Sequence, residues 1–229
     1  GAHLSRAIAR GGLVIIPSFA VGRVQTLLLL ISRLKKRGAL PDVPIYLNSP
    51  MAVDATRIYH TYRSQHRLSA AECDAACRVA EFVNTPEASK ALNGKQGPMV
   101  IISASGMATG GRVVHHIKAF APDPKNLILF SGFQASGTRG ANMLGGAETV
   151  RIHGAEIPIR AEVANLETLS GHADYAEILD WLKSFSQAPG NIFLTHGEPA
   201  AADQLRQHIE AKFGWECSVP DYRETVTIP

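Results

Sequence analysis

The sequence predicts an α/β protein built on a parallel sheet, and three observations carry this prediction. Short apolar runs rich in β-branched residues alternate with longer segments whose apolar residues recur at helical spacing. Most of these runs end at reversals that contain glycine, proline or serine. The 229 residues are also enough for one large domain or two smaller ones with a proper core. We therefore expect parallel strands that are covered by helices.

The alternation is clearest in the first 130 residues. Residues 21–36 show it well, because apolar side chains recur there every three or four positions, as on one face of a helix. The strands expected in this part are 13–16, 44–47, 99–103 and 126–130, and the expected helices are 21–36, 51–65, 70–83 and 110–120. This order is typical of βαβ units and predicts a Rossmann-like sheet.

A different pattern begins near Gly145. Residues 149–152 and 157–163 are expected to be antiparallel strands around a turn at 153–156. Asp174 followed by Glu177 is a capping-box arrangement and predicts the start of a helix. The remaining expected elements are a strand that leads to His196, a helix marked by Leu205, Ile209 and Phe213, and a short final strand at 225–228.

Composition excludes several classes of protein. Hydrophobic residues make up 45% and charged residues 19%, which is ordinary for a globular protein, and no apolar run reaches transmembrane length. We therefore expect no membrane partner. The net charge of +3 permits a nucleic-acid partner without arguing for one, because the basic residues do not gather in a dedicated cluster. Three cysteines without a disulfide framework indicate reduced thiols and a cytoplasmic location.

Two histidines stand at neighbouring chain reversals near the C-terminal end. His196 follows the apolar run 192–195, and His172 lies just before the helix that Asp174 begins. Histidine is the commonest metal ligand and the commonest acid or base near neutral pH. Two imidazoles are too few for a catalytic zinc site, which needs about three protein ligands. His115 and His116 are adjacent, point in different directions on a helix and are not expected to bind one metal.

Three glycine-bearing loops follow predicted parallel strands, at residues 17–23, 103–112 and 131–138. Open α/β sheets bind ligands at this edge, and free backbone N–H groups with serine and arginine side chains suit a phosphate. Ser105, Gly106 and Arg112 are the best candidates. The alternative is that these loops are only tight turns and that Arg112 pairs with an acidic side chain.

The sequence resembles the β-CASP branch of the metallo-β-lactamase superfamily, and most closely its bacterial and archaeal RNA-processing nucleases. Five motifs carry the resemblance, occur in the family's order and cover nearly the whole chain. They are Ile16-Pro17-Ser18-Phe19-Ala20-Val21-Gly22-Arg23, Asn48-Ser49-Pro50-Met51-Ala52, Ser105-Gly106-Met107 with Gly110-Gly111-Arg112, Ser170-Gly171-His172-Ala173-Asp174 and Leu194-Thr195-His196-Gly197-Glu198.

The resemblance implies a fold, a site and a reaction. Residues 1–140 would form a Rossmann-like β-CASP domain, and 141–229 the C-terminal portion of a metallo-β-lactamase αββα domain. His172 would be a catalytic residue that assists protonation of the leaving group. His196 would bind one of two zinc ions, which would activate water for hydrolysis of a phosphodiester in single-stranded RNA. A homodimer is an open alternative to a monomer.

The chain also departs from the family. The family's His-x-His-x-Asp-His zinc motif and its other upstream ligands do not occur here. The chain begins Gly1-Ala2-His3, without methionine or signal peptide, and we interpret it as the later part of a longer protein. The resemblance then implies that this chain alone is inactive and does not hold the zinc pair.

Two other functions remain to be weighed. One is a non-catalytic β-CASP scaffold that binds RNA, which would apply if the upstream zinc ligands were degenerate. The other is a Rossmann-like nucleotide-binding protein. The second is weaker, because no Gly-x-Gly-x-x-Gly turn with a downstream ribose-binding acid is present.

Overall fold

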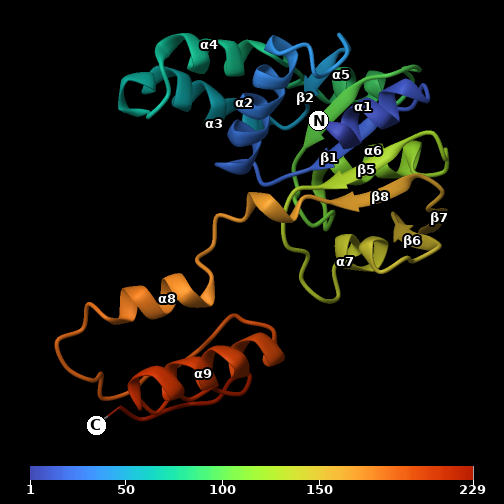
Figure 1. The fold of residues 1–229 in the computed structure, drawn as a ribbon. Coiled ribbons are helices and arrows are strands. Elements are labelled where there is room, and N and C mark those ends of the chain that lie inside the picture. Colours follow the sequence, from blue (N-terminus) through green and yellow to red (C-terminus); the bar gives the residue numbers. More distant parts are fainter. Residues whose placement is uncertain (229) are drawn as a thin grey trace. The chain divides into compact units, whose positions relative to one another are not determined.

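A computed structural model describes residues 1–228 of the chain (Figure 1). The chain forms two compact units, Gly1–Leu169 and a smaller one from Ser170 onward. Among the described residues, no helix is both long enough and apolar enough to span a membrane.

The larger unit is organised around a six-stranded sheet with the order β3-β2-β4-β1-β5-β8. The strands are β1 (Val14–Pro17), β2 (Ile45–Leu47), β3 (Glu81–Phe82), β4 (Val100–Ser103), β5 (Leu127–Phe130) and β8 (Glu162–Asn165). Every neighbouring pair in this sheet is parallel. The predicted parallel sheet is therefore confirmed, and the carboxyl ends of the strands meet at one edge.

Helices cover both faces of the sheet, which explains why its central strands are apolar throughout. One face packs on α1 (Ala2–Ala9), α2 (Arg23–Lys36) and α3 (Pro50–Thr61). The other face packs on α5 (Pro86–Leu92), α6 (Gly111–Phe120), α7 (Arg139–Leu144) and the antiparallel hairpin of β6 (Thr149–Ile152) and β7 (Ala155–Pro158). Alternate side chains of β1 serve the two cores, since Ile16 belongs to the first and Ile15 to the second.

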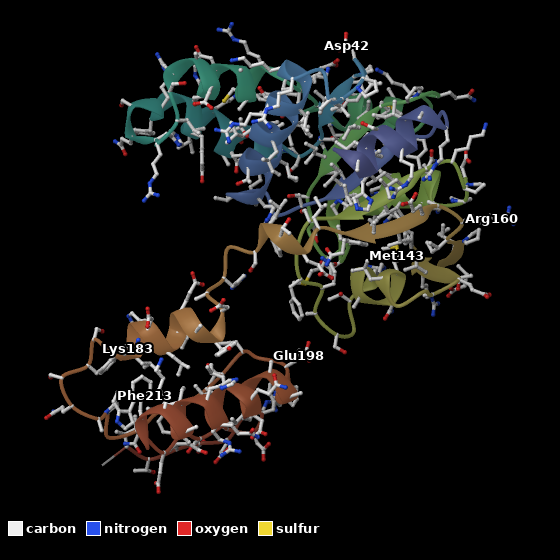
Figure 2. All side chains as sticks on the ribbon, viewed as in Figure 1. Asp42, Met143, Arg160, Lys183, Glu198 and Phe213 are labelled. Carbon is white, nitrogen blue, oxygen red and sulfur yellow. The ribbon has the colours of Figure 1, made fainter. Side chains whose placement is uncertain are left out.

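The remaining elements of the larger unit are short. Helix α4 (Ala70–Arg78) packs against α2 and α3, and single 3-10 turns occur at η1 (Arg63–Gln65) and η2 (Glu167–Leu169). Met143 of α7, labelled in Figure 2, is almost fully buried in the second core.

The smaller unit consists mainly of two packed helices, α8 (Tyr175–Leu182) and α9 (Pro199–Phe213). The predicted capping box is confirmed, because Asp174 Oδ1 accepts from Glu177 N at 2.9 Å and Glu177 Oε2 accepts from Asp174 N at 3.0 Å. The two helices run in the same direction (Figure 1), and Phe213, labelled in Figure 2, packs against the apolar cluster between them.

The structure corrects the predicted elements in three parts of the chain. The helix expected at 70–83 ends at Arg78, and Glu81–Phe82 instead form the edge strand β3. The strand expected at 157–163 is divided, because the N–H groups of Arg160 and Ala161 both donate to the carbonyl of Ala121 and turn the chain away from the hairpin. β8 then joins the large sheet beside β5.

The third correction concerns the C-terminal segment. Residues 225–228 form no strand, and near His196 the only strand pairing among the described residues is a bridge between Phe193 and Ser218. Helices α1, α5 and α7 were not predicted. The sequence assigned residues 1–140 and 141–229 to two family domains, whereas the compact units describe how the chain packs. The domain assignment stays a prediction.

Candidate functional site

The loop after β4 holds two of the predicted phosphate-binding residues. Ser105 Oγ lies 2.9 Å from Thr109 Oγ1, and the carbonyl of Ser105 accepts from Ala108 N at 3.2 Å. Ala108 has the left-handed backbone conformation, with φ of 54°. These bonds close the loop on itself before α6 begins, while the Ser105 side chain remains partly exposed at the carboxyl edge of the sheet.

Gly106 joins this loop to the loops after β1 and β5. A Cβ atom on Gly106 would lie 3.0 Å from two ring atoms of Phe19, which is closer than ordinary packing allows. The carbonyl of Gly106 accepts from Gln134 Nε2 at 3.1 Å, and the same amide donates to Gly132 O. The three glycine-bearing loops that the sequence indicated therefore come together, and Gly106 is the residue on which they meet.

Arg112 is anchored inside this unit. Its Nη1 donates to Asn48 Oδ1 at 2.9 Å and to Val83 O at 3.0 Å, and its Nη2 donates to Asn84 O at 2.6 Å. Arg112 thus ties the ends of β2 and β3 to the start of α6, through an amide and two carbonyls rather than through an acidic partner. Its predicted contact with phosphate stays a prediction.

Behind Arg112 lies a buried polar network centred on His116. His116 is fully buried, with Nε2 at 2.6 Å from Asn48 Nδ2 and Nδ1 at 2.6 Å from Asn93 Oδ1. Burial, with smaller contributions from His115 and Arg112, lowers the pKa of His116 to about 4. The imidazole is neutral near pH 7, so Nε2 accepts from Asn48 and Nδ1–H donates to Asn93. Sequence reasoning weighed His116 only as a metal ligand, although its position on the buried stripe of α6 indicated a packing role.

The two predicted active-site histidines lie in turns of the smaller unit. Both are exposed, and the backbone N–H of His172 donates to Ser170 Oγ at 3.2 Å. His196 has the left-handed conformation, with φ of 67°. His172 precedes α8 and His196 precedes α9, and these helices run in the same direction (Figure 1). The two turns therefore lie at the same end of this unit.

The described residues do not make up a metal site by themselves. Within residues 1–228, no three histidine, cysteine, aspartate or glutamate side chains are arranged to hold an ion. His196 can offer one imidazole ligand, whereas a catalytic zinc needs about three. The donor groups within residues 1–228 therefore do not by themselves fit a catalytic zinc site. The predicted approach of the Ser105 loop to the two histidines involves both units and stays a prediction.

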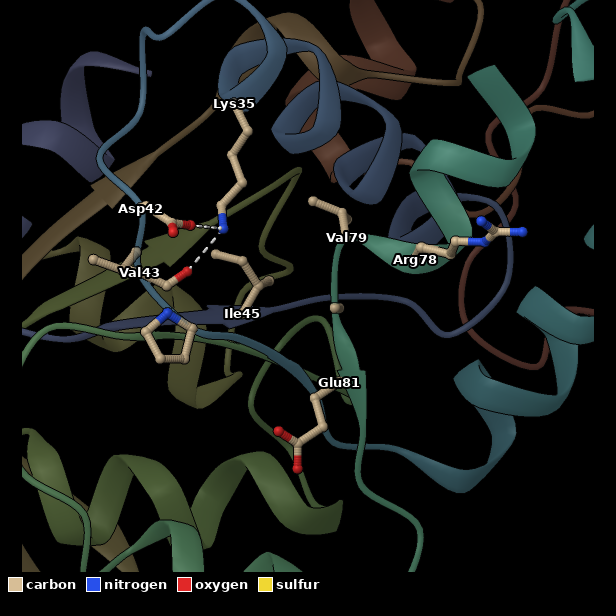
Figure 3. Close-up of a pocket in the computed structure, with 9 residues that line it drawn as sticks. Lys35, Asp42, Val43, Ile45, Arg78, Val79 and Glu81 are labelled. Carbon is tan, nitrogen blue, oxygen red and sulfur yellow. Dashed lines mark hydrogen bonds and ion pairs between the residues drawn. The ribbon is translucent and has the colours of Figure 1, made fainter. Parts of the chain in front are cut away.

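A hollow of about 480 Å³ lies at the opposite edge of the sheet, where β2 and β3 begin (Figure 3). Lys35 Nζ bonds there to Asp42 Oδ1 at 2.9 Å and to Val43 O at 3.0 Å. This lysine is therefore already satisfied by the protein. The hollow lies at the amino ends of β2 and β3, and none of the predicted site residues lines it.

Comparison with known proteins places two family models on the chain. The model described as the Beta-Casp domain matches residues 24–143, and the one described as the Zn-dependent metallo-hydrolase RNA specificity domain matches residues 156–220. The first covers the strand-end loops after β4 and β5, and the second contains both His172 and His196.

Curated relatives agree with these matches. Ribonuclease TTHA0252 of Thermus thermophilus is 39% identical over 98% of this chain and 52% of its own length. Transcription termination factor FttA of Methanosarcina mazei is 29% identical over 98% of this chain and 37% of its own length, and an RNase J-like protein of Methanocaldococcus jannaschii is 35% identical over 86% and 45%. The chain thus spans about half or less of these relatives. Because the first family model matches more than half of the chain, the chain belongs to the Beta-Casp family.

Proposed function

We propose that this chain is part of a zinc-dependent ribonuclease that hydrolyses phosphodiester bonds in single-stranded RNA. The observation that carries the proposal is the placement of His172 and His196 in two turns at the same end of one unit. Both lie inside the segment that matches the Zn-dependent metallo-hydrolase RNA specificity domain. Relatives named as ribonucleases support hydrolysis of RNA as the reaction.

Each histidine has a distinct proposed role. His196 contributes one ligand to a zinc centre of two ions, whose other ligands come from outside this chain. When bound, zinc polarises the phosphate and lowers the pKa of water. His172 holds a proton and delivers it to the oxygen that leaves the phosphorus, which is general acid catalysis. The exposure of both imidazoles suits these roles, because each must reach groups beyond the smaller unit.

The strand-end loops of the larger unit are the proposed RNA contact. Ser105 offers a partly exposed hydroxyl, and the loop around Gly106 offers backbone N–H groups. Arg112 has five N–H groups, and its three internal bonds leave others for a phosphate oxygen. We place the two segments 1–140 and 141–229 in the β-CASP and metallo-β-lactamase domains. A cytoplasmic location and a homodimer belong to the same proposal.

A non-catalytic RNA-binding scaffold is the second candidate function. It is supported by the match of residues 156–220 to an RNA specificity domain, and it applies if the zinc ligands outside these residues are degenerate. A scaffold would bind RNA without cleaving it, and substitution of His196 would leave its properties unchanged.

Cleavage of labelled single-stranded RNA by the protein expressed from its complete gene distinguishes the two candidates. We expect cleavage by the wild type and its loss in His196→Ala. His153→Ala is the matched control, because His153 is also exposed in a turn and also has positive φ, at 49°. Absence of cleavage by the wild type with zinc supplied would favour the scaffold.

A further inference from the structure

We propose that Phe19, Arg23 and Phe133 form a contact surface for single-stranded RNA, the strand-end patch. The rings of Phe19 and Phe133 would stack on unpaired bases, and the Arg23 guanidinium would bind a backbone phosphate between them. This inference rests on the proposed function, and it adds residues to which that function assigned no role.

The three side chains gather around the junction of the strand-end loops. Phe19 follows β1, is 52% exposed and lies against Gly106. Phe133 follows β5 and is 64% exposed. Nη2 of Arg23 lies 3.9 Å from the position that a Cβ atom on Gly132 would occupy, next to Phe133. All three therefore stand at the carboxyl edge of the sheet, beside the loop that holds Ser105.

Gln134 holds this junction in place. Its Nε2 lies 3.1 Å from each of three carbonyl oxygens, which belong to Gly106, Gly132 and Phe133. The loop that carries Phe133 is thus bonded to the loop on which Phe19 packs. Hydrogen bonds thus hold together the loops that carry the two rings. This order reduces the conformational entropy that the loops would lose when a ligand binds.

Arg23 differs from the other arginines of this edge in having no partner. Arg112 and Arg139 both donate to backbone carbonyls. No hydrogen bond or ion pair joins the Arg23 guanidinium to any residue in the range 1–228, although this side chain is half-buried. Arg23 is also the first residue of α2, where the helix dipole disfavours a cation. The Arg23 side chain therefore does not stabilise α2, and its guanidinium is available to bind an external anion.

The combination of groups favours single-stranded nucleic acid over a protein partner. Exposed aromatic rings beside an unpaired guanidinium match the alternation of bases and phosphates along a strand. An apolar protein surface would instead bury the Arg23 charge without compensation. In a duplex the base faces are already stacked on each other, so the two rings would select unpaired RNA.

Fluorescence anisotropy with a labelled oligouridine tests the proposal on the 229-residue chain. We expect Arg23→Gln to weaken binding about tenfold. It should also reduce the slope of log affinity against log salt concentration by about 0.7, the value for one lost phosphate contact on a single strand. Arg37→Gln is the matched control, because Arg37 is exposed at the opposite end of the same helix and carries the same charge.

Substitution of the rings separates stacking from charge. Phe133→Ala should weaken binding about tenfold without changing the salt slope, whereas Phe133→Tyr should retain binding. A hairpin duplex with the same number of phosphates should bind the wild type more weakly than oligouridine. The melting temperature of Arg23→Gln should be unchanged or higher, because a cation is removed from a helix N-terminus.

The outcomes distinguish this inference from the proposed function. If Arg23→Gln and Phe133→Ala both bound oligouridine as strongly as the wild-type chain, the strand-end patch would be overturned. The nuclease proposal would remain intact. Failure of the wild-type chain to bind oligouridine would also overturn the patch, and the cleavage assay would still decide the function. Equal losses in Arg23→Gln and Arg37→Gln would show that only net charge matters, which would contradict the proposal.

Discussion

Arg112 and Asn48 are joined by a hydrogen bond of 2.9 Å between Nη1 of the arginine and Oδ1 of the asparagine. The amide nitrogen of the same asparagine reaches Ser89 Oγ at 2.8 Å and His116 Nε2 at 2.6 Å. One asparagine therefore connects an arginine at the site edge with a buried histidine. The carboxyl end of β2 is held by this network, so the residues next to the proposed RNA contact depend on it for their position.

Arg112→Ala should lower the stability of the larger unit by about 2 kcal/mol. The substitution leaves Asn48 Oδ1 and the carbonyl of Val83, both in buried residues, without their donor. Urea denaturation measures the change. Arg139→Ala is the control, since Arg139 also donates to backbone carbonyls but lies outside the Asn48 network. Full stability in Arg112→Ala, with a loss of RNA affinity alone, would assign Arg112 to the ligand rather than to the fold.

The neutral His116 should make the larger unit less stable in mild acid. Its pKa is about 4 in the folded chain and about 6.5 when unfolded, so the unfolded state binds more protons between these values. The stability due to this group is fully present above pH 6.5 and is lost as the pH falls toward 4. The loss over this window is about 3 kcal/mol.

NMR provides two readouts for this pH dependence. The C2–H signal of His116 should not titrate above about pH 5, and the methyl signals of the buried Ile101 and Ile128 should report an earlier urea transition at pH 5 than at pH 7. His116→Gln should show a shallower dependence on pH. Titration of His116 near pH 6.5 would contradict a buried, neutral imidazole.

Gly106→Ala should disturb the junction of the strand-end loops. The new methyl group would lie 3.0 Å from the Phe19 ring and 3.2 Å from the backbone nitrogen of Phe19, and the nitrogen cannot move independently of the chain. We expect a cost of about 1–3 kcal/mol from overpacking and weaker binding of RNA. Gly137→Ala is the control, because a Cβ atom there meets no neighbour but the residue has positive φ. Calorimetry of the two variants therefore compares a steric clash at Gly106 with backbone strain at Gly137.

The 229-residue chain should not retain a pair of zinc ions. The one proposed ligand, His196, falls short of the three or more that a stable site requires. Metal analysis after dialysis against a weak chelator, together with an RNA cleavage assay, tests this expectation. Two tightly held zinc ions per chain would show that the ligand set is present within these residues.

The sheet could be predicted because its signal is local. Strands such as β1 and β4 are continuous apolar runs closed by turn residues, and a strand buried on both faces requires this pattern. The edge strand β3 has only two residues, and the sequence around it continues the pattern of α4. Its strand conformation comes from pairing with β2. This pairing is a tertiary contact and cannot be predicted from the local hydrophobic pattern.

The site could be predicted only in part, for a related reason. The glycine-bearing motifs identified the loops, because each follows an apolar strand run at the edge where parallel strands end. The partners of Arg112 come from segments 28 to 64 residues away, so the sequence did not show that its guanidinium is engaged. Arg23 belongs to the first of the indicated loops but was not chosen as a site residue, since its lack of a partner is visible only in three dimensions.

The central claim is that His172 and His196 belong to one hydrolytic centre and perform different tasks there. It is tested most directly by measuring zinc content and RNA cleavage together, in His172→Ala and His196→Ala of the protein expressed from its complete gene. We predict that His196→Ala loses both zinc and cleavage. His172→Ala should keep its zinc and lose cleavage by roughly 10²–10⁴-fold, the range for a group that acts in proton transfer. Equal loss of zinc in both variants, or full cleavage by either, would contradict the account.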